Sequence, residues 1–356
     1  MGEVLGIGVT HYPPLSGGDD DMAWVIRKGL QDPLVPDSAK DPSTWPAAMR
    51  AEWGEDEGRR AAREHRAALL EGLERCRAEL DAFAPDVVVI WGDDQYENFR
   101  EDIIPPYAVL AYPDMTIKPW AHLAHSSGMA GRSNVWQEGP ETEIAVKGSP
   151  DIARWLATRL LEQGVDVAYA YQPLHHDGMA HAFLNTILYL DYHRQGFPYP
   201  VVQFPLNCYG SKVIADKGFA RPFGEQPRQP DPPAPPPWRF MEVGAAVAKA
   251  FAGSDLRAAL VASSSWSHAF TTDKTWRLQP DVAADRELYA ALVSGDYDTW
   301  RKRTIVEVED SGQQELLNWH TLLGAMEALG RTGPDWSTFV QSYVFNSSKA
   351  FAVYKP

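Results

Sequence analysis

The chain has 356 residues, of which 44% are hydrophobic and 23% charged, a size and composition typical of globular proteins with one large domain or two ordinary ones. Its 33 basic and 48 acidic side chains give a net charge of −15, which argues against a surface for nucleic acid or anionic membranes. The two cysteines, Cys76 and Cys208, form no Cys-x-x-Cys pair, and the sequence shows neither a signal peptide nor a membrane-length apolar run. We therefore expect a reducing, cytoplasmic location, with no disulfide framework, thiolate metal site or membrane partner.

Apolar runs that end in polar residues recur along the chain. Predicted strands cover 4–9, 87–91, 165–171, 199–206 and 258–263, and an aromatic, β-rich segment covers 337–354. Predicted helices cover 58–83, 150–163, 181–192, 240–252, 283–294 and 312–329. This alternation predicts one α/β domain over 1–356, with a central mixed, mostly parallel sheet flanked by helices.

Three segments, about 13–60, 100–147 and 222–237, show weak periodicity and are predicted to be long irregular insertions. The second contains His122 and His125, whose spacing fits half of a metal site, although ordinary loop histidines are the preferred interpretation. His65, within the predicted helix 58–83, is interpreted as a solvent-exposed histidine on a helix face.

Polar clusters follow four of the predicted strands. They are His11, the group Asp93-Asp94-Gln95, the group His175-His176-Asp177, and His268. A histidine at a strand end is by itself more often structural, but the strand ends of one α/β sheet meet in one crevice. Histidine and carboxylate together are the ligands that Fe(II), Mn(II) or Zn(II) would need.

Other chemistries have weaker support in the sequence. The serine-rich segment 263–267 lacks the Gly-x-Ser-x-Gly turn of a nucleophilic serine, so a serine hydrolase is not favoured. No Gly-x-Gly-x-x-Gly or Walker motif is present, which argues against nucleotide binding.

Short motifs in this chain resemble those of the class III extradiol ring-cleavage dioxygenases, the family of the protocatechuate 4,5-dioxygenase β subunit. The similar segments are 8–13, 175–178, 261–268 and 314–319. The resemblance implies that His11 and Glu315 are iron ligands and that His268 is the active-site acid/base. It also implies a second catalytic histidine, His176, with His175 as the alternative.

The chain departs from the family pattern at 93–95, where Gln95 occupies the position of the family's second iron-binding histidine. An amide oxygen suits harder ions than imidazole does. Either Gln95, Asp94 or Asp93 completes the metal site, or His175 substitutes for the histidine, or the site has moved away from iron oxygenase chemistry.

The resemblance implies a non-haem, Fe(II)-dependent oxidoreductase of aromatic compound catabolism. Such an enzyme would cleave the ring of a catechol-like substrate with O₂, with Mn(II) or Zn(II) as the alternative metals. Because related proteins commonly form dimers, a homodimer is expected. The alternatives are a metal-dependent hydrolase or lyase on the same scaffold, and a non-catalytic binding protein of this fold.

Overall fold

An eight-stranded sheet forms the centre of the protein in a computed structural model, which describes residues 2–121, 132–176, 178–211, 216–218 and 229–356. In spatial order its strands are β6 (Ala168–Ala170), β3 (Ala108–Leu110), β7 (Val201–Leu206), β2 (Val87–Asp93), β8 (Arg257–Ser263), β1 (Glu3–Val9), β10 (Lys349–Tyr354) and β9 (Trp336–Val340). Strands β7, β2, β8 and β1 are parallel, as are β3 and β6, whereas β10 and β9 pair antiparallel at one edge. The predicted α/β fold with a mixed, mostly parallel sheet is confirmed.

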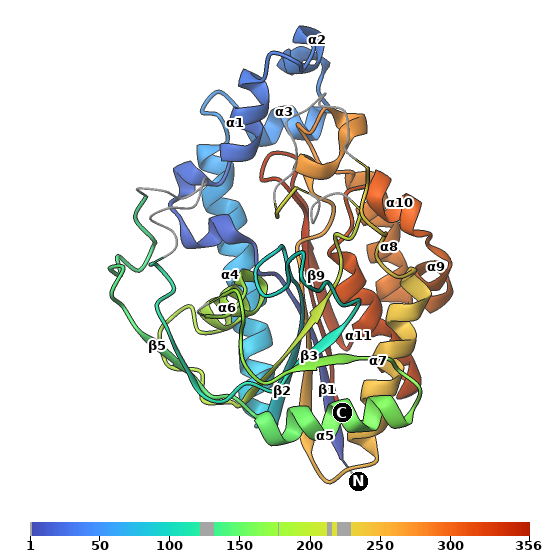
Figure 1. The fold of residues 1–356 in the computed structure, drawn as a ribbon. Helices are drawn as coiled ribbons and strands as arrows, with labels where there is room; N and C mark the ends of the chain where they lie inside the picture. Colours follow the sequence, from blue (N-terminus) through green and yellow to red (C-terminus); the bar gives the residue numbers. More distant parts are fainter. Residues whose placement is uncertain (1, 122–131, 177, 212–215, 219–228) are drawn as a thin grey trace.

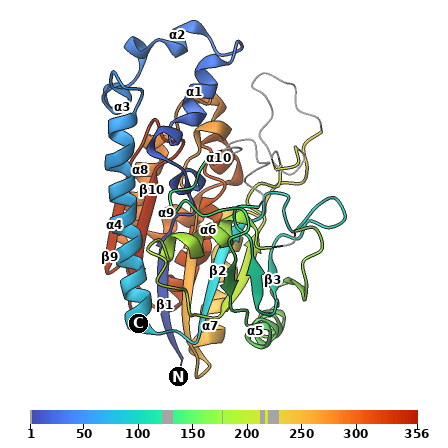
Figure 2. The same cartoon turned by 90° about the vertical axis from the view of Figure 1, so that its left-hand side faces the viewer.

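Helices cover both faces of the sheet (Figures 1 and 2). One face packs against α4 (Arg59–Phe83) and α6 (His181–Leu190), and the other against α5 (Pro150–Glu162), α7 (Pro237–Ala252) and α11 (Leu316–Ala328). Along β2, Val87, Val89 and Trp91 belong to the core beneath α7 and α11, while Val88 and Ile90 belong to the core beneath α4 and α6. The uninterrupted apolar run of β2 follows from this burial on both faces.

Strand register brings the predicted polar clusters to one edge of the sheet. Ala262 of β8 pairs with Gly8 of β1 on one side and with Trp91 of β2 on the other. Gly8, Ala262 and Trp91 therefore lie side by side across the sheet. His11 follows Gly8 by three residues, and Asp93 follows Trp91 by two. The segment that leads to His268 begins where β8 ends.

The segment 13–60 extends beyond the carboxyl ends of the strands (Figure 1). It contains the short helices α1 (Trp24–Gln31), α2 (Asp37–Lys40) and α3 (Ala47–Trp53). The irregular assignment of 100–147 was wrong for β3, which is a strand of the main sheet, and for the separate pair β4 (Met115–Ile117) and β5 (Ile144–Val146). Strands of three residues are too short to show a periodic pattern.

Helices α8 (Val282–Ser294), α9 (Tyr297–Lys302) and α10 (Ile305–Asp310) precede α11, and the last two of these were not predicted. Within the described ranges, no helix is both long and apolar enough to cross a membrane. The predicted loop histidines His122 and His125, Asp177, and the first part of the Pro-rich segment 222–237 lie outside the described residues.

The solvent-exposed interpretation of His65 was wrong. His65 is 6% exposed, and its Nε2 lies 3.0 Å from the Nζ of the fully buried Lys349. Lys349 also donates to the carbonyls of Phe345 and Ser347, and its Nζ lies 3.5 Å from the centroid of the Tyr12 ring. Burial lowers the pKa of His65 well below its usual value, so the neutral ring accepts a hydrogen bond from the lysine. The sequence pattern of α4 does not reveal that other parts of the chain, such as Lys349, cover the face of α4 on which His65 lies.

Glycines allow α7 and α11 to approach each other closely. A Cβ atom on Gly324 would lie 2.0 Å from the carbonyl oxygen of Met241, and one on Gly244 would lie 1.8 Å from that of Thr321. This contact fixes the position of α11, which begins directly after Glu315.

Substitution of Gly324 by alanine should lower the free energy of unfolding by about 1–3 kcal/mol, because the added methyl group overpacks the contact between the helices. The matched control is Gly139→Ala, where a Cβ would meet nothing within 4 Å and the change should be below about 0.5 kcal/mol. Chemical denaturation measures both variants. Equal stability of the two would contradict the assigned contact.

Candidate metal centre

Four side chains of metal-ligand type meet at the carboxyl edge of the sheet. They are His11, Asp93, His181 and Glu315, which we call the strand-end cluster. His11 Nε2 lies 3.4 Å from Asp93 Oδ1 and 3.4 Å from Glu315 Oε2. Ligand atoms of His11, Asp93 and His181 all lie within 4.8 Å of one another. His11, Asp93 and Glu315 are at most 2% exposed, whereas the His181 side chain is 27% exposed.

The Asp93 carboxylate is the strongest sign that this cluster suits a cation. Both of its oxygens are buried, and neither has a hydrogen-bond donor among the described residues. Its contact with His11, at 3.4 Å, is too long for a good hydrogen bond. Burial raises the pKa of Asp93 to about 6, and the nearby Glu315 carboxylate contributes in the same direction. A buried carboxylate without donors is costly unless it binds a cation, so these residues fit a divalent metal ion.

Both histidines of the cluster are oriented through their Nδ1 atoms. His11 Nδ1 lies 3.2 Å from Ser263 Oγ, and His181 Nδ1 lies 2.8 Å from Glu97 Oε2. The second oxygen of Glu97 accepts the backbone N–H of His181 at 2.8 Å. Burial alone would lower the pKa of His181, but the Glu97 carboxylate raises it to about 10. Contacts of this kind are typical of metal-binding histidines, whose Nε2 then faces the ion.

Glu315 is fixed through both of its carboxylate oxygens. Oε1 accepts a hydrogen bond from the Tyr209 hydroxyl at 2.7 Å, and Oε2 accepts one from the backbone N–H of Ser265 at 2.9 Å. Although burial would raise the pKa of Glu315, His268 and His11 hold it well below its usual value. Of the two buried carboxyl groups, Glu315 is therefore the more acidic, and Asp93 is the one that first takes up a proton.

His268 lies beside the cluster on the segment that follows β8. Its Nε2 is 3.2 Å from Glu315 Oε1, and its backbone N–H donates to the Gly312 carbonyl at 2.8 Å. Its Nδ1 is buried and has no hydrogen-bond partner in the described part of the chain. Burial alone would lower the pKa of His268, but Glu315 raises it above the usual value. A histidine whose pKa is raised by an adjacent carboxylate is suited to proton transfer.

The structure brings together three of the residues predicted from sequence, His11, Glu315 and His268. It does not bring Asp94 or Gln95 to the cluster. The Asp94 carboxylate instead accepts the backbone N–H groups of residues 97, 98 and 99 and so closes the loop after β2. Among the described residues, no hydrogen bond or ion pair joins the Gln95 side chain to the cluster. Because successive side chains of a strand point to opposite sides, the carboxylate that faces His11 is Asp93, which the sequence left as an alternative.

The two predicted catalytic histidines of the 171–180 connection lie outside the cluster. His175 Nε2 is 2.8 Å from Asp102 Oδ1 near the surface, so His175 does not replace the missing histidine. His176 Nδ1 accepts the backbone N–H of Gly178, and the pKa of Glu97, which burial alone would raise, is lowered mainly by His181 and less by His176. His176 therefore lies close to the carboxylate that orients His181.

Sequence reasoning missed His181, Glu97 and Tyr209. His181 is the first residue of α6, five residues after His176. The one feature of the sequence that could have pointed to His181 is its position after a predicted strand. Glu97 and Tyr209 follow the strands β2 and β7 by four and three residues, and nothing distinguishes them from ordinary loop residues.

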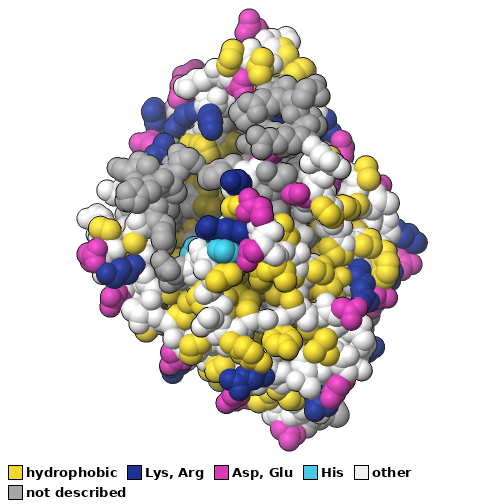
Figure 3. Space-filling view, in the orientation of Figure 1, with side chains coloured by type: hydrophobic (Ala, Val, Ile, Leu, Met, Phe, Trp, Pro, Cys, Tyr) yellow, Lys and Arg dark blue, Asp and Glu magenta, His cyan; other side chains and the backbone are white. Residues whose placement is uncertain are grey.

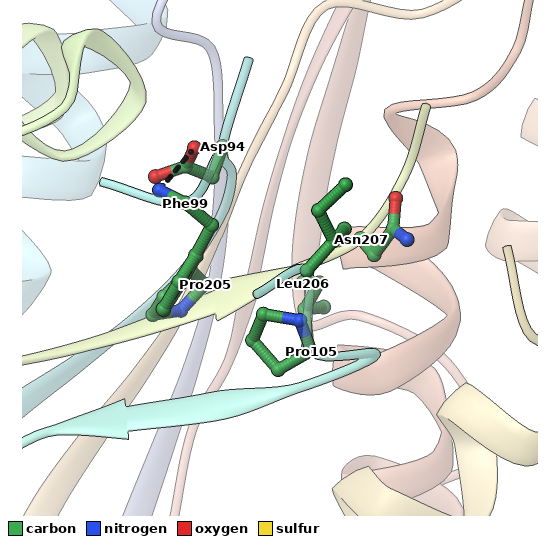
Figure 4. A pocket seen from close by; sticks show the side chains of 7 residues that line it. Asp94, Phe99, Pro105, Pro205, Leu206 and Asn207 are labelled. Atoms are coloured by element: carbon green, nitrogen blue, oxygen red, sulfur yellow. Dashed lines mark hydrogen bonds between the residues drawn. The ribbon is translucent and has the colours of Figure 1, made fainter. Parts of the chain in front are cut away.

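A small pocket lies next to the ends of β2 and β7 (Figure 4). Its lining residues are Asp94, Phe99, Ile104, Pro105, Pro205, Leu206 and Asn207. No member of the strand-end cluster lines this pocket, and its walls are mostly apolar.

Replacement of Asp93 by asparagine should weaken metal binding and at the same time stabilise the metal-free protein at pH 8 by about 1 kcal/mol or more, because a buried charge without donors is removed. The folded pKa of about 6 exceeds the ordinary value of 3.8, so the metal-free wild type loses stability as the pH rises from about 4 through 6. The gain should therefore shrink at pH 4. Thermal unfolding in chelator and metal titration measure the two effects, and a loss of stability in the variant at pH 8 would show that Asp93 is structural.

Replacement of Tyr209 by phenylalanine should weaken metal affinity about 10- to 100-fold, the usual effect of losing a group that orients a ligand. Competition with a chromophoric chelator measures the affinity. The control is Tyr199→Phe, since the Tyr199 hydroxyl donates to Asp81 at 2.6 Å near the surface. Unchanged affinity in the Tyr209 variant would mean that Glu315 is not a ligand or does not need this donor.

Comparison with solved structures gives a distant structural likeness. No family model matches the chain, and no curated protein matches it. Among solved structures, the chain is similar to an uncharacterised protein of Escherichia coli K12, JW3007, at 14% identity and a TM-score of 0.45, over 80% of this chain and 91% of that chain. A likeness this low does not indicate a function.

Proposed function

We propose that the protein is a mononuclear non-haem metal enzyme, and specifically an Fe(II)-dependent dioxygenase that cleaves the ring of a catechol-like aromatic with O₂. The observation that carries the proposal is the buried Asp93 carboxylate, which lacks donors among the described residues and faces His11 beside Glu315. Two imidazoles and two carboxylates form a ligand set that suits Fe(II), with Mn(II) or Zn(II) as alternatives.

When bound, Fe(II) would supply Lewis acidity and a path for electrons between a bound diol and O₂. The residues of the chain would hold and orient the reactants. Glu315 and His181 are both fixed by second groups, Tyr209 and Glu97, so the ligand positions are set before a substrate binds. This preorganisation removes the need to rearrange ligands during the reaction.

His268 is the residue best placed to move a proton. Its Nε2 lies 3.2 Å from Glu315 Oε1, which raises the pKa of His268 above its usual value, and its buried Nδ1 has no hydrogen-bond partner among the described residues. Ring opening requires a proton to reach a developing oxyanion, and a histidine with a raised pKa begins in the protonated form that this step needs. His176, near Glu97, is the proposed second proton-transfer residue.

A metal-dependent hydrolase or lyase is the second candidate function. Asp93 favours this function, because it provides a second carboxylate where the family pattern has a second iron-binding histidine. Such a ligand set suits Zn(II) or Mn(II), and a hydrolase or lyase does not require redox chemistry. A purely binding role has less support, since a buried, acidic cluster is costly to retain without a bound ion.

Oxygen uptake after anaerobic loading with Fe(II) separates these functions. The panel is catechol, protocatechuate, gallate and aminophenols, with an oxygen electrode and an absorbance spectrum as readouts. Oxygen uptake with a new yellow absorbance supports ring cleavage. Retention of Zn(II) or Mn(II) with no oxygen uptake across the panel favours the second candidate, and failure to retain any divalent metal contradicts both enzymatic proposals.

Substitution of His268 by alanine should leave metal content unchanged and lower turnover by about 10²- to 10⁴-fold, the usual contribution of a positioned acid/base. Metal analysis and steady-state kinetics check the two effects. The matched control is His193→Ala, because His193 is 56% exposed and pairs with Glu74 at the surface. If the His268 variant lost its metal as well, His268 would be a ligand and the assigned role would be wrong.

A further inference from the structure

His268 and Glu315 lie on two segments that are in direct contact. The first segment, 264–272, follows β8, and the second, 311–315, precedes α11. The backbone N–H of His268 donates to the Gly312 carbonyl at 2.8 Å. Gly312 has a positive φ of 65°, and a Cβ atom on it would lie 2.6 Å from the His268 carbonyl oxygen. The spacing of the two segments therefore decides whether His268 Nε2 reaches Glu315 Oε1, which lies 3.2 Å away.

One buried carboxylate, that of Asp285 in α8, joins both segments. Its Oδ1 accepts the backbone N–H of Ser267 at 3.0 Å and the side-chain Nε2–H of Gln313 at 2.8 Å. Ser267 directly precedes His268, and Gln313 lies two residues before Glu315. A single oxygen atom of α8 thus links the segment of the proton-transfer histidine to the segment of a proposed metal ligand.

The start of α8 also contacts both segments through a second set of hydrogen bonds. The backbone N–H of Asp281 donates to Ser267 Oγ at 2.7 Å, and the Ser311 hydroxyl donates to Asp281 Oδ2 at 3.0 Å. The Ser267 hydroxyl in turn donates to the Ser311 carbonyl. Because none of these bonds involves Asp285, they should preserve the local fold when Asp285 is replaced.

Asp285 is too deeply buried to contact a substrate. Asp285, Ser267 and Gln313 are at most 1% exposed, so they do not reach the surface, on which Figure 3 shows a hollow with hydrophobic side chains inside it. A buried carboxylate is costly compared with a well-packed apolar side chain, so stability alone does not explain Asp285. Any effect of Asp285 on the chemistry has to act through the two segments that it joins.

We propose that Asp285 is a positioning residue, which holds the segments of His268 and Glu315 at the spacing that proton transfer needs. Both donors bind the same oxygen, so neither segment can move away without losing a hydrogen bond. A misplacement of about 1 Å at reacting groups can lower a rate about 100-fold. The role rests on the proposed function for the part that His268 plays, but the link between the segments can be measured without turnover.

Two replacements of Asp285 separate its hydrogen bonds from its charge. Asparagine presents a neutral amide oxygen that can accept both donors, whereas alanine removes the acceptor. Nuclear magnetic resonance of the metal-free protein with isotope-labelled histidine, at one fixed pH, reports the ring environment of His268, whose signals are assigned by their loss in His268→Ala. Asp285→Ala should shift these signals, and Asp285→Asn should keep them at the wild-type positions.

Two further variants complete this experiment. Asp296→Ala is the control for a general loss of stability, because Asp296 caps α9 by accepting the N–H of Thr299 at 3.1 Å, and it should not move the His268 signals. Gln313→Met removes one of the two donors at similar side-chain size and should shift the signals less than Asp285→Ala does. It tests the link even if Asp285→Ala does not fold. Unmoved His268 signals in Gln313→Met and in folded Asp285→Ala, or equal shifts in the alanine and asparagine variants of Asp285, would overturn the positioning role.

Turnover at saturating Fe(II) then separates this role from the proposed function. Asp285→Ala should react about 10- to 100-fold more slowly than the wild type at equal metal content, and Asp285→Asn should recover most of the loss. Wild-type turnover in Asp285→Ala would refute the positioning role and leave the proposed function intact. Shifted His268 signals in a protein that retains no metal would keep the link between the segments and refute the proposed function instead.

Discussion

The placement of two buried carboxylates, Asp93 and Glu315, against one histidine, His11, is the constraint on which the proposed metal centre depends. Like charges at such a short range cannot both remain ionised without compensation. Glu315 is compensated by three donors and keeps a low pKa, whereas Asp93 has no donor among the described residues and its pKa is raised to about 6. A divalent cation would relieve this imbalance without changing the fold.

Strand register and helix packing position the residues of the strand-end cluster. Parallel strands bring His11 and Asp93 to the same edge of the sheet, and the close contact of α7 with α11 sets the start of α11, where Glu315 lies. The surrounding groups restrict each ligand further, as Glu97 does for His181. The site is therefore built from positions far apart in the sequence whose geometry is fixed before any ligand binds.

The sequence predicted the parts of this arrangement that follow from local patterns. Apolar runs located the strands, and short motifs pointed to His11, Glu315 and His268, which the structure brings together. The sequence could not show that Asp94 closes a loop, because that depends on backbone N–H groups three to five residues later.

The sequence also did not show that His181 belongs to the strand-end cluster, since this depends on where α6 begins in three dimensions. The sequence around a helical histidine does not show whether its side chain is buried or exposed, as the buried His65 also illustrates. Residues brought together by tertiary packing cannot be recognised from spacing along one sequence.

The most direct test of the account is a crystal structure of the protein soaked with Fe(II) under anaerobic conditions, or with Zn(II), in which anomalous scattering locates the metal. We predict one ion bound by His11, Asp93, His181 and Glu315, with His268 outside the ligand set. An ion bound instead through Gln95 or Asp94, or the absence of an anomalous peak at the strand ends after soaking, would contradict it.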